Sequence, residues 1–218
     1  MCVMISGSPS LPHTTPHYRM GLTPGPSDAL LIIDVQNDFL PGGALAVPEG
    51  DAILPVIRQL TDLPFGVIIT SQDWHPAQHI SFKTATPAGL WPSHCVAGTQ
   101  GAALAADLTV PAETLAVFKG TQMDQDSYSA FGGADAQGVS LEALLQRHGI
   151  NRVFLCGLAL DYCVQASALD ARKAGLETVV LTDACRGIAH DLTPALTALR
   201  TAGVILCSSQ DLAPDILN

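Results

Sequence analysis

Six short apolar runs alternate along this chain with segments that show helical periodicity. The segment 51–63, for example, places Ile53, Ile57 and Leu60 at helical spacing. The predicted strands are 29–34, 66–70, 116–118, 153–156, 178–181 and 204–207, and the predicted helices are 51–63, 140–148, 162–174 and 191–200. This alternation predicts an α/β fold built around a mostly parallel sheet.

The stretch 153–175 combines a predicted strand, a tight corner and a predicted helix. Asp161 is a good helix N-cap, and Gly175 stands where a glycine would end the helix. Cys163 then lies in the first helical turn, where free backbone N–H groups shift a thiol toward the nucleophilic thiolate. Ligands also bind at such strand-to-helix corners of open parallel sheets. A buried structural cysteine is the alternative interpretation.

The segment after the second predicted strand is rich in residue types that bind metal ions. Asp73, His75 and His79 fall within seven residues, and His94 follows in the same long irregular passage. Two histidines and one carboxylate can hold a divalent ion and leave positions open for water or substrate. A chance cluster of surface histidines is the alternative, although no other stretch of the sequence combines His and Asp so densely.

Charged residues stand at the ends of two predicted strands. Asp34 closes the first strand, and Lys119 directly follows the run 116–118. A lysine at the end of a buried strand needs a nearby anion. Right-handed crossovers would bring these strand ends to one edge of the sheet, so we expect Lys119 to face Asp34 and the sulfur of Cys163. For Asp34 alone, a turn or helix-cap role is the alternative.

Composition limits the classes of partner. The 218 residues are 48% hydrophobic, with a mean hydropathy of +0.31, which is enough for one large packed domain. No apolar run approaches the ~20 residues that a membrane span needs. Ten basic against twenty acidic residues give a net charge of −10, which disfavours binding to nucleic acid or to anionic membranes. A small-molecule partner is therefore expected.

Cysteine usage and the N-terminal composition bear on location and domain organisation. The six cysteines include no CxxC pair, and most lie at or beside predicted strands, which favours a reducing, cytoplasmic location. Residues 1–27 carry five prolines among Ser, Thr and Gly, a composition that cannot supply a core. We expect a flexible N-terminal extension over 1–27 and a single domain over 28–218.

Six separated motifs follow one another along the chain. They are DVQNDF with Asp34, DWHPAQHISF with Asp73 and His75, WPSHC with His94, VFKG with Lys119, DSYSAF with Tyr128 and CGLALDYCV with Cys163. In this order the motifs resemble the nicotinamidases of the isochorismatase-like cysteine hydrolase family. The resemblance implies a three-layer α/β/α sandwich with a six-stranded, mostly parallel sheet.

The resemblance also implies the catalytic groups. The family's catalytic triad falls on Asp34, Lys119 and Cys163. A cis peptide bond of the family would join Leu158 to Ala159. The backbone N–H groups of Ala159 and Cys163 would then form an oxyanion hole.

A metal site follows from the same resemblance. The family's ligands fall on Asp73, His75 and His94, which would hold one divalent ion, whether zinc, iron or manganese. Some relatives use a histidine near the position of His79 as a further ligand and others do not, and we expect His79 to lie beside the ligands without binding the ion directly.

The activity implied by the resemblance is that of a metal-containing cysteine amidohydrolase. It would convert nicotinamide to nicotinate and ammonia through a thioester in NAD salvage, and pyrazinamide would be a further substrate. Phe39, Trp91 and Tyr128 are the aromatic residues expected around the ring. A homo-oligomer is compatible with this assignment. The alternatives are a related amidohydrolase acting on a carbamoyl or ureido substrate, whose family generally lacks the metal ligands, and a non-enzymatic metal-binding thiol sensor.

Overall fold

A computed structural model of the protein describes residues 22–212, and it shows a six-stranded sheet in the order β3-β2-β1-β4-β5-β6 with every neighbouring pair parallel. The strands are β1 (Asp28–Ile33), β2 (Val67–Asp73), β3 (Leu115–Lys119), β4 (Arg152–Leu158), β5 (Glu177–Arg186) and β6 (Ile205–Cys207). The helices are α1 (Leu54–Thr61), α2 (Leu141–Arg147), α3 (Gln165–Lys173) and α4 (Thr193–Thr201). The predicted fold class is confirmed.

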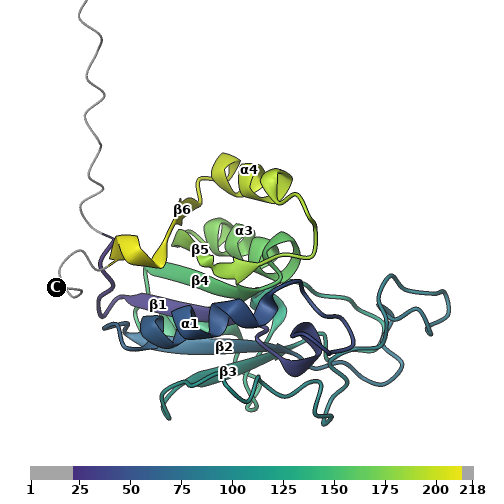
Figure 1. Ribbon diagram of the computed structural model, residues 1–218. Coiled ribbons are helices and arrows are strands. Elements are labelled where there is room, and N and C mark those ends of the chain that lie inside the picture. Colours follow the sequence, from purple (N-terminus) through teal and green to yellow (C-terminus); the bar gives the residue numbers. More distant parts are fainter. Residues whose placement is uncertain (1–21, 213–218) are drawn as a thin grey trace, which may run out of the picture.

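The helices cover both faces of the sheet (Figure 1). The crossover from β1 to β2 through α1 runs in the opposite direction along the sheet from the crossovers through α2, α3 and α4. Because such connections are right-handed, α1 packs on one face and the other helices pack on the opposite face. The direction reverses between β1 and β4, and in open parallel sheets the crevice at the carboxyl ends of these strands is where ligands bind.

Burial on both faces explains the composition of the central strands. All six residues of β1 are buried, and β4 is buried from Val153 onward. A strand covered on both faces reads as a continuous apolar run, which is why the apolar runs of the sequence predict these strands.

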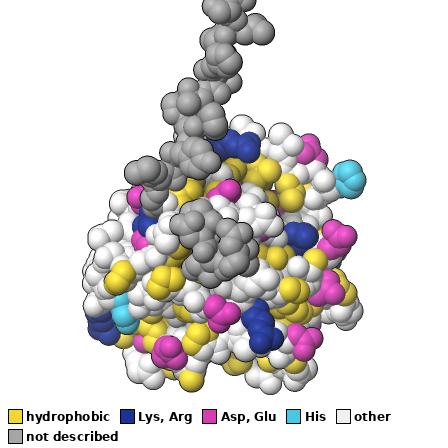
Figure 2. All heavy atoms as spheres, turned by 60° about the vertical axis from the view of Figure 1, so that its left-hand side comes forward, with side chains coloured by type: hydrophobic (Ala, Val, Ile, Leu, Met, Phe, Trp, Pro, Cys, Tyr) yellow, Lys and Arg dark blue, Asp and Glu magenta, His cyan; other side chains and the backbone are white. Residues whose placement is uncertain are grey.

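No helix among residues 22–212 has the length and apolar character needed to cross a membrane. On the face that Figure 2 draws, Lys and Arg side chains are dispersed among acidic and hydrophobic ones.

Several predicted boundaries are confirmed by capping contacts. The Ser140 hydroxyl accepts a hydrogen bond from the Ala143 N–H at 3.3 Å at the start of α2. Gly175 follows α3 with φ +84°, as expected of a glycine that ends a helix. The helix predicted over 51–63 is longer than the observed α1 (Leu54–Thr61), because residues Gly50–Ile53 form a 3-10 helix before it.

The predicted helix start at Asp161 is wrong. Residues Leu160–Val164 form a π-helical turn in which the Val164 N–H donates to the Ala159 carbonyl at 3.1 Å, and α3 begins only at Gln165. The Asp161 side chain does not cap this turn, because its carboxylate binds backbone N–H groups of a distant loop. Cys163 therefore lies in a π-helical turn that continues into α3, not in the first turn of an α-helix.

The chain packs against the domain before β1 begins. Leu22 is buried, and the Thr23 carbonyl accepts a hydrogen bond from the Arg152 guanidinium at 3.2 Å. Contacts with the domain thus begin within the segment 22–27, which was expected to belong to the flexible extension. The rest of that extension, residues 1–21, lies outside the described part of the chain.

One glycine lets β1 and β4 approach closely at the switch point. Gly157 has φ +117°, and a Cβ atom built on it would lie 2.1 Å from the Ile33 carbonyl oxygen. The register between β4 and β5 also shifts between Leu155 and Gly157. Any larger residue would push β4 away from the residue that precedes Asp34.

We predict that Gly157→Ala lowers the free energy of unfolding by at least about 3 kcal/mol, because the backbone of two central strands must separate. Gly138→Ala is the matched control, since Gly138 also has positive φ, +81°, but a Cβ there meets nothing within 4 Å. The control should lose about 1 kcal/mol from backbone strain alone. Urea unfolding curves measure both, and equal losses would contradict the close-packing argument.

Candidate active site

Three strand ends bring Asp34, Lys119 and Cys163 together. Asp34 follows β1, Lys119 ends β3, and Cys163 lies in the turn after β4. The Lys119 ammonium lies 2.9 Å from Asp34 Oδ2 and 3.5 Å from Cys163 Sγ, and all three side chains are buried. These are the contacts of Lys119 that the strand order predicts.

Asp73 is a second anion on Lys119. The two residues are register partners across β2 and β3, and the Lys119 ammonium donates a short hydrogen bond to Asp73 Oδ1. Burial alone would lower the pKa of Lys119, but Asp34 and Asp73 outweigh burial and raise this pKa well above its usual value. The lysine is therefore a permanent cation between two carboxylates.

The two carboxylates differ in their protonation behaviour. Burial raises the pKa of Asp34 more than Lys119 lowers it, and the adjacent Asp73 charge raises it further. Burial also acts to raise the pKa of Asp73, but there Lys119 and His75 outweigh it and hold the pKa below its usual value. Asp73 is thus a fixed anion, whereas Asp34 can take up and release a proton.

The expected shift of Cys163 toward thiolate is not what the protein's own groups produce. Burial raises the pKa of the Cys163 thiol well above its usual value, and the charges of Asp34 and Asp73 add to this effect. Lys119 opposes the rise without overcoming it. The sulfur is therefore held as a thiol, and it needs a base at the moment of attack.

Asp34 is placed to be that base. The Ser71 hydroxyl donates a 2.6 Å hydrogen bond to Asp34 Oδ1, while Oδ2 is the oxygen that lies 2.9 Å from the Lys119 ammonium. The carboxylate and Cys163 Sγ lie within 4.8 Å of one another. Asp34 has φ +50°, so the chain turns sharply after β1 and presents the carboxylate to the sulfur.

Asp73, His75 and His94 converge on one point. Their ligand atoms lie within 4.8 Å of one another, and all three residues are buried. The His75 Nδ1–H donates to the Gly120 carbonyl at 2.9 Å, and the His94 Nδ1–H donates to the Pro92 carbonyl at 2.8 Å. With Nδ1 engaged, Nε2 is the ring nitrogen that each histidine turns toward the shared point, as histidine ligands of metal ions do, and the His75 Nε2 lies 3.5 Å from Asp73 Oδ2. The donor set fits a divalent ion.

His79 lies beside this set but has both ring nitrogens occupied. Its Nδ1 accepts from the Ser81 hydroxyl at 2.7 Å, and its Nε2–H donates to the Gln125 carbonyl at 3.1 Å. The ring stacks on His75 with a centroid distance of 4.1 Å. His79 thus lies against the candidate ligand set, and its exclusion from that set stays a prediction.

Gln36 is a positioning residue that sequence reasoning missed. Its side-chain amide accepts from the Asp73 N–H and donates to the Asp73 carbonyl, each at 2.8 Å, and it also donates to the Ala102 carbonyl. These contacts fix the backbone of Asp73 where β2 ends. The sequence carried little signal for this role, because Gln36 is followed by two other polar residues, Asn37 and Asp38.

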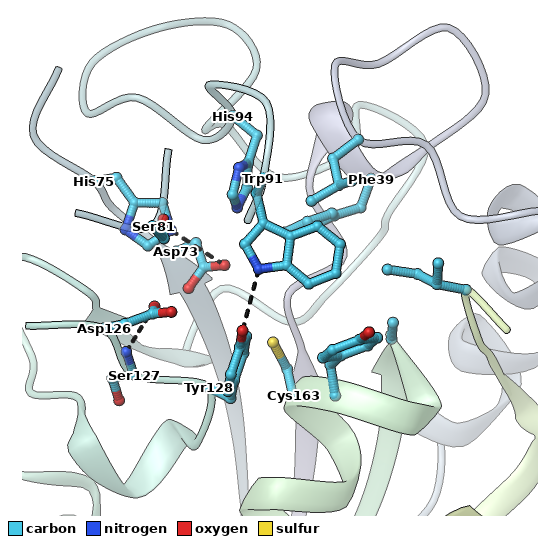
Figure 3. Close-up of a pocket in the computed structure, with 14 residues that line it drawn as sticks. Phe39, Asp73, His75, Ser81, Trp91, His94, Asp126, Ser127, Tyr128 and Cys163 are labelled. Carbon is cyan, nitrogen blue, oxygen red and sulfur yellow. Dashed lines mark hydrogen bonds and ion pairs between the residues drawn. The ribbon is translucent and has the colours of Figure 1, made fainter. Parts of the chain in front are cut away.

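The expected aromatic residues enclose a pocket above Cys163 (Figure 3). The Trp91 Nε1–H donates to the Tyr128 hydroxyl at 3.1 Å, and Phe39 lies 5.6 Å from His94 between ring centroids. The pocket is small, with a cavity volume of about 30 Å³, and the Cys163 side chain also lines it.

Further lining residues were not among the predicted substrate contacts. Tyr162 packs edge-on against Trp91, with ring centroids 5.0 Å apart, and Leu45 and Ile188 complete the wall. Leu45 and Ile188 lie in irregular loops, where neither periodicity nor residue type predicts a functional position. Only the folded chain shows that they face the same cavity.

Ala159 lines the pocket next to Cys163. The peptide bond between Leu158 and Ala159 is cis, as the resemblance implied. Cys95, which directly follows His94 in the sequence, is the alternative candidate for the nucleophile, but it is buried outside the pocket lining, and burial raises the pKa of its thiol. Its N–H donates to Asp38 at 2.7 Å, which holds the loop that carries His94.

Comparison with known proteins agrees with this geometry. Residues 28–211 match the family described as the Isochorismatase domain. A nicotinamidase of Acinetobacter baylyi is 42% identical over 201 residues, which cover 84% of this chain and 94% of that protein. The pyrazinamidase of Pyrococcus horikoshii in complex with zinc has a TM-score of 0.75 at 38% identity, with 84% of this chain and 99% of that chain covered.

A structure of PnC1 from L. infantum in complex with nicotinate has a TM-score of 0.79 at 42% identity, with 87% of this chain and 96% of that chain covered. The family match extends over residues 28–211, a range that contains every residue of the site described above. This chain belongs to the isochorismatase family of hydrolases.

Proposed function

We propose that this protein hydrolyses nicotinamide to nicotinate and ammonia, with Cys163 as the nucleophile. The observation that carries the proposal is the contact of Lys119 with both Asp34 and Cys163, next to a pocket that Cys163 lines together with Asp73, His75 and His94. Relatives named nicotinamidase, at 38–42% identity, support the same substrate.

The first half-reaction forms a thioester. Asp34 takes the proton of the Cys163 thiol as the sulfur attacks the carboxamide carbon. The carbonyl oxygen becomes an oxyanion, which the backbone N–H groups of Ala159 and Cys163 stabilise. Asp34 then gives its proton to the departing nitrogen, so that ammonia leaves and the acyl group stays on sulfur.

The second half-reaction returns the enzyme to its starting state. Asp34 takes a proton from water, and the resulting hydroxide attacks the thioester carbon. The C–S bond breaks, the sulfur regains a proton, and nicotinate is released. Lys119 stays charged throughout, and its role is to offset the negative charge that develops on Cys163 and Asp34.

We assign the metal site to Asp73, His75 and His94, which would hold one divalent ion such as zinc, iron or manganese. Bound there, the ion would supply a Lewis-acidic point for the pyridine nitrogen or for a water next to it. Zinc is supported by the zinc-bound Pyrococcus horikoshii relative. Phe39, Trp91 and Tyr128 would hold the ring, so that the carboxamide lies over the sulfur.

Two further expectations belong to this proposal. Pyrazinamide has the same carboxamide on a similar ring, so we expect it to be a substrate. The five cysteines in the described residues are free thiols, and catalysis requires Cys163 to be reduced, which suits a cytoplasmic location. A homo-oligomer stays a prediction.

The proposed function is tested by measuring nicotinamide turnover of the purified protein together with its metal content by elemental analysis.

The first prediction separates Cys163 from its rival. Cys163→Ala should lose activity by at least about a thousandfold while metal content and melting temperature stay near wild type, because sulfur attacks the substrate and does not bind the ion. Cys95→Ala is the matched control and should keep most of the activity. If Cys163→Ala retained a tenth of wild-type turnover, the nucleophile would be assigned wrongly.

The second prediction separates the metal site from proton transfer. His94→Ala should lose bound metal and raise KM for nicotinamide at least about tenfold, because it removes a positioning group. Asp34→Asn should keep metal and KM but lower kcat by about 10²- to 10⁴-fold, because it removes the base. Asparagine tolerates the positive φ of Asp34, so the backbone should not change. Loss of metal from Asp34→Asn would show that Asp34 is a ligand instead.

The third prediction concerns the charge of Lys119. Since Lys119 lowers the pKa of the Cys163 thiol, Lys119→Met should move the pH midpoint of Cys163 alkylation by iodoacetamide upward. The variant should fold and retain metal. Lys173→Met is the control, because Lys173 is largely exposed and far from the site in the fold. Superimposable profiles for Lys119→Met and wild type would leave Lys119 without an electrostatic role.

A further inference from the structure

The carboxylate of Asp161 connects the nucleophile turn to the loop between β5 and α4. Its Oδ1 accepts a hydrogen bond from the Ile188 N–H and its Oδ2 accepts one from the Ala189 N–H, both at 2.9 Å. Asp161 lies two residues before Cys163, and the loop that it binds follows the end of β5. Both oxygens of a single carboxylate are therefore used on two consecutive backbone groups.

The local sequence allows this close approach. A Cβ atom on Gly187 would lie 2.9 Å from Asp161 Oδ1 and 2.3 Å from a methyl group of Leu192. Only glycine lets the loop come near enough for both N–H groups to reach the carboxylate. Asp161 makes no capping hydrogen bond in its own turn, so its side chain is available to the loop.

The loop held by Asp161 forms part of the substrate pocket. Ile188 lines the cavity together with Ala159, Tyr162 and Cys163. Its N–H is one of the two groups fixed by Asp161, so the position of the Ile188 side chain depends on that hydrogen bond. The nucleophile turn and this apolar wall are thereby joined as one unit.

Resting on the proposed hydrolysis, we infer that Asp161 is a positioning residue that fixes Ile188 as a wall of the substrate pocket, without itself touching the substrate. Hydrogen bonds from N–H groups to a carboxylate are stronger than those to neutral acceptors, so one side chain can order an irregular loop. The ring would be held against Ile188 while Cys163 attacks its carboxamide. Removal of the contact should weaken binding much more than it slows chemistry.

Kinetics test this role. Asp161→Ala should raise KM for nicotinamide about tenfold and change kcat by less than about threefold, because it releases Ile188, the residue that would contact the ring. Ile188→Ala should have the same effect. The double variant should be no worse than the more affected single variant, since both changes remove one interaction. Additive effects, or a loss confined to kcat, would overturn the inference.

Asp191→Ala is the matched control. Asp191 lies in the same loop and accepts a hydrogen bond from the Thr193 N–H at 2.9 Å, but the structure gives it no contact with the nucleophile turn. This variant loses a loop carboxylate of the same type and should leave KM unchanged. Asp161→Asn keeps one acceptor oxygen and should fall between wild type and Asp161→Ala.

Amide hydrogen exchange tests the same contact without using activity. The Ile188 and Ala189 amides should exchange about tenfold faster in Asp161→Ala than in wild type, with no change in Asp191→Ala. Unchanged exchange at both amides would overturn the inference whatever the kinetics show. If wild-type protein failed to hydrolyse nicotinamide, the proposed function would fail, and exchange alone would decide the role of Asp161. A variant too unstable to purify would be replaced by Asp161→Asn, for which the same exchange is measured.

Discussion

A buried ammonium between two buried carboxylates is the constraint on which this site depends. Lys119 ends β3, and its partners, Asp73 and Asp34, lie at the ends of the next two strands of the sheet. Loss of one partner from such a group costs about 3–5 kcal/mol, because an uncompensated charge stays buried. The parallel register of β1, β2 and β3 therefore fixes three charges whose positions cannot vary independently.

This constraint links two parts of the site that do different work. Asp73 belongs both to the ion pair with Lys119 and to the metal-ligand set with His75 and His94. Asp34 forms a second ion pair with Lys119 and lies near the sulfur of Cys163. The spacing of the strands thus sets the distance between the metal-ligand set, which would position the ring, and the Cys163 sulfur, which would attack its carboxamide. Loops supply the pocket walls and the proposed ligands His75 and His94, and the Asp161 carboxylate binds one of these loops to the nucleophile turn.

Much of the fold could be predicted from the sequence, because the strands are buried on both faces and read as uninterrupted apolar runs. Residues at the ends of these strands, such as Asp34 and Lys119, could be predicted for the same reason. The turn at Cys163 could not, because the pattern there fits an α-helix and the π-helical turn depends on hydrogen bonds made by the folded chain. The pKa of Cys163 also depends on burial by distant segments, and Ile188 lies in a loop with no periodic signal.

Detection of an acyl-enzyme tests most directly whether Cys163 is the nucleophile. Metal-loaded wild-type protein is mixed with nicotinamide, quenched in acid within milliseconds to seconds, digested and analysed by mass spectrometry. We predict a nicotinoyl group on the peptide that contains Cys163. This group should appear before nicotinate accumulates and should be absent from the peptide that contains Cys95. Steady turnover without any acyl group on Cys163, or with the group on Cys95, would contradict this prediction.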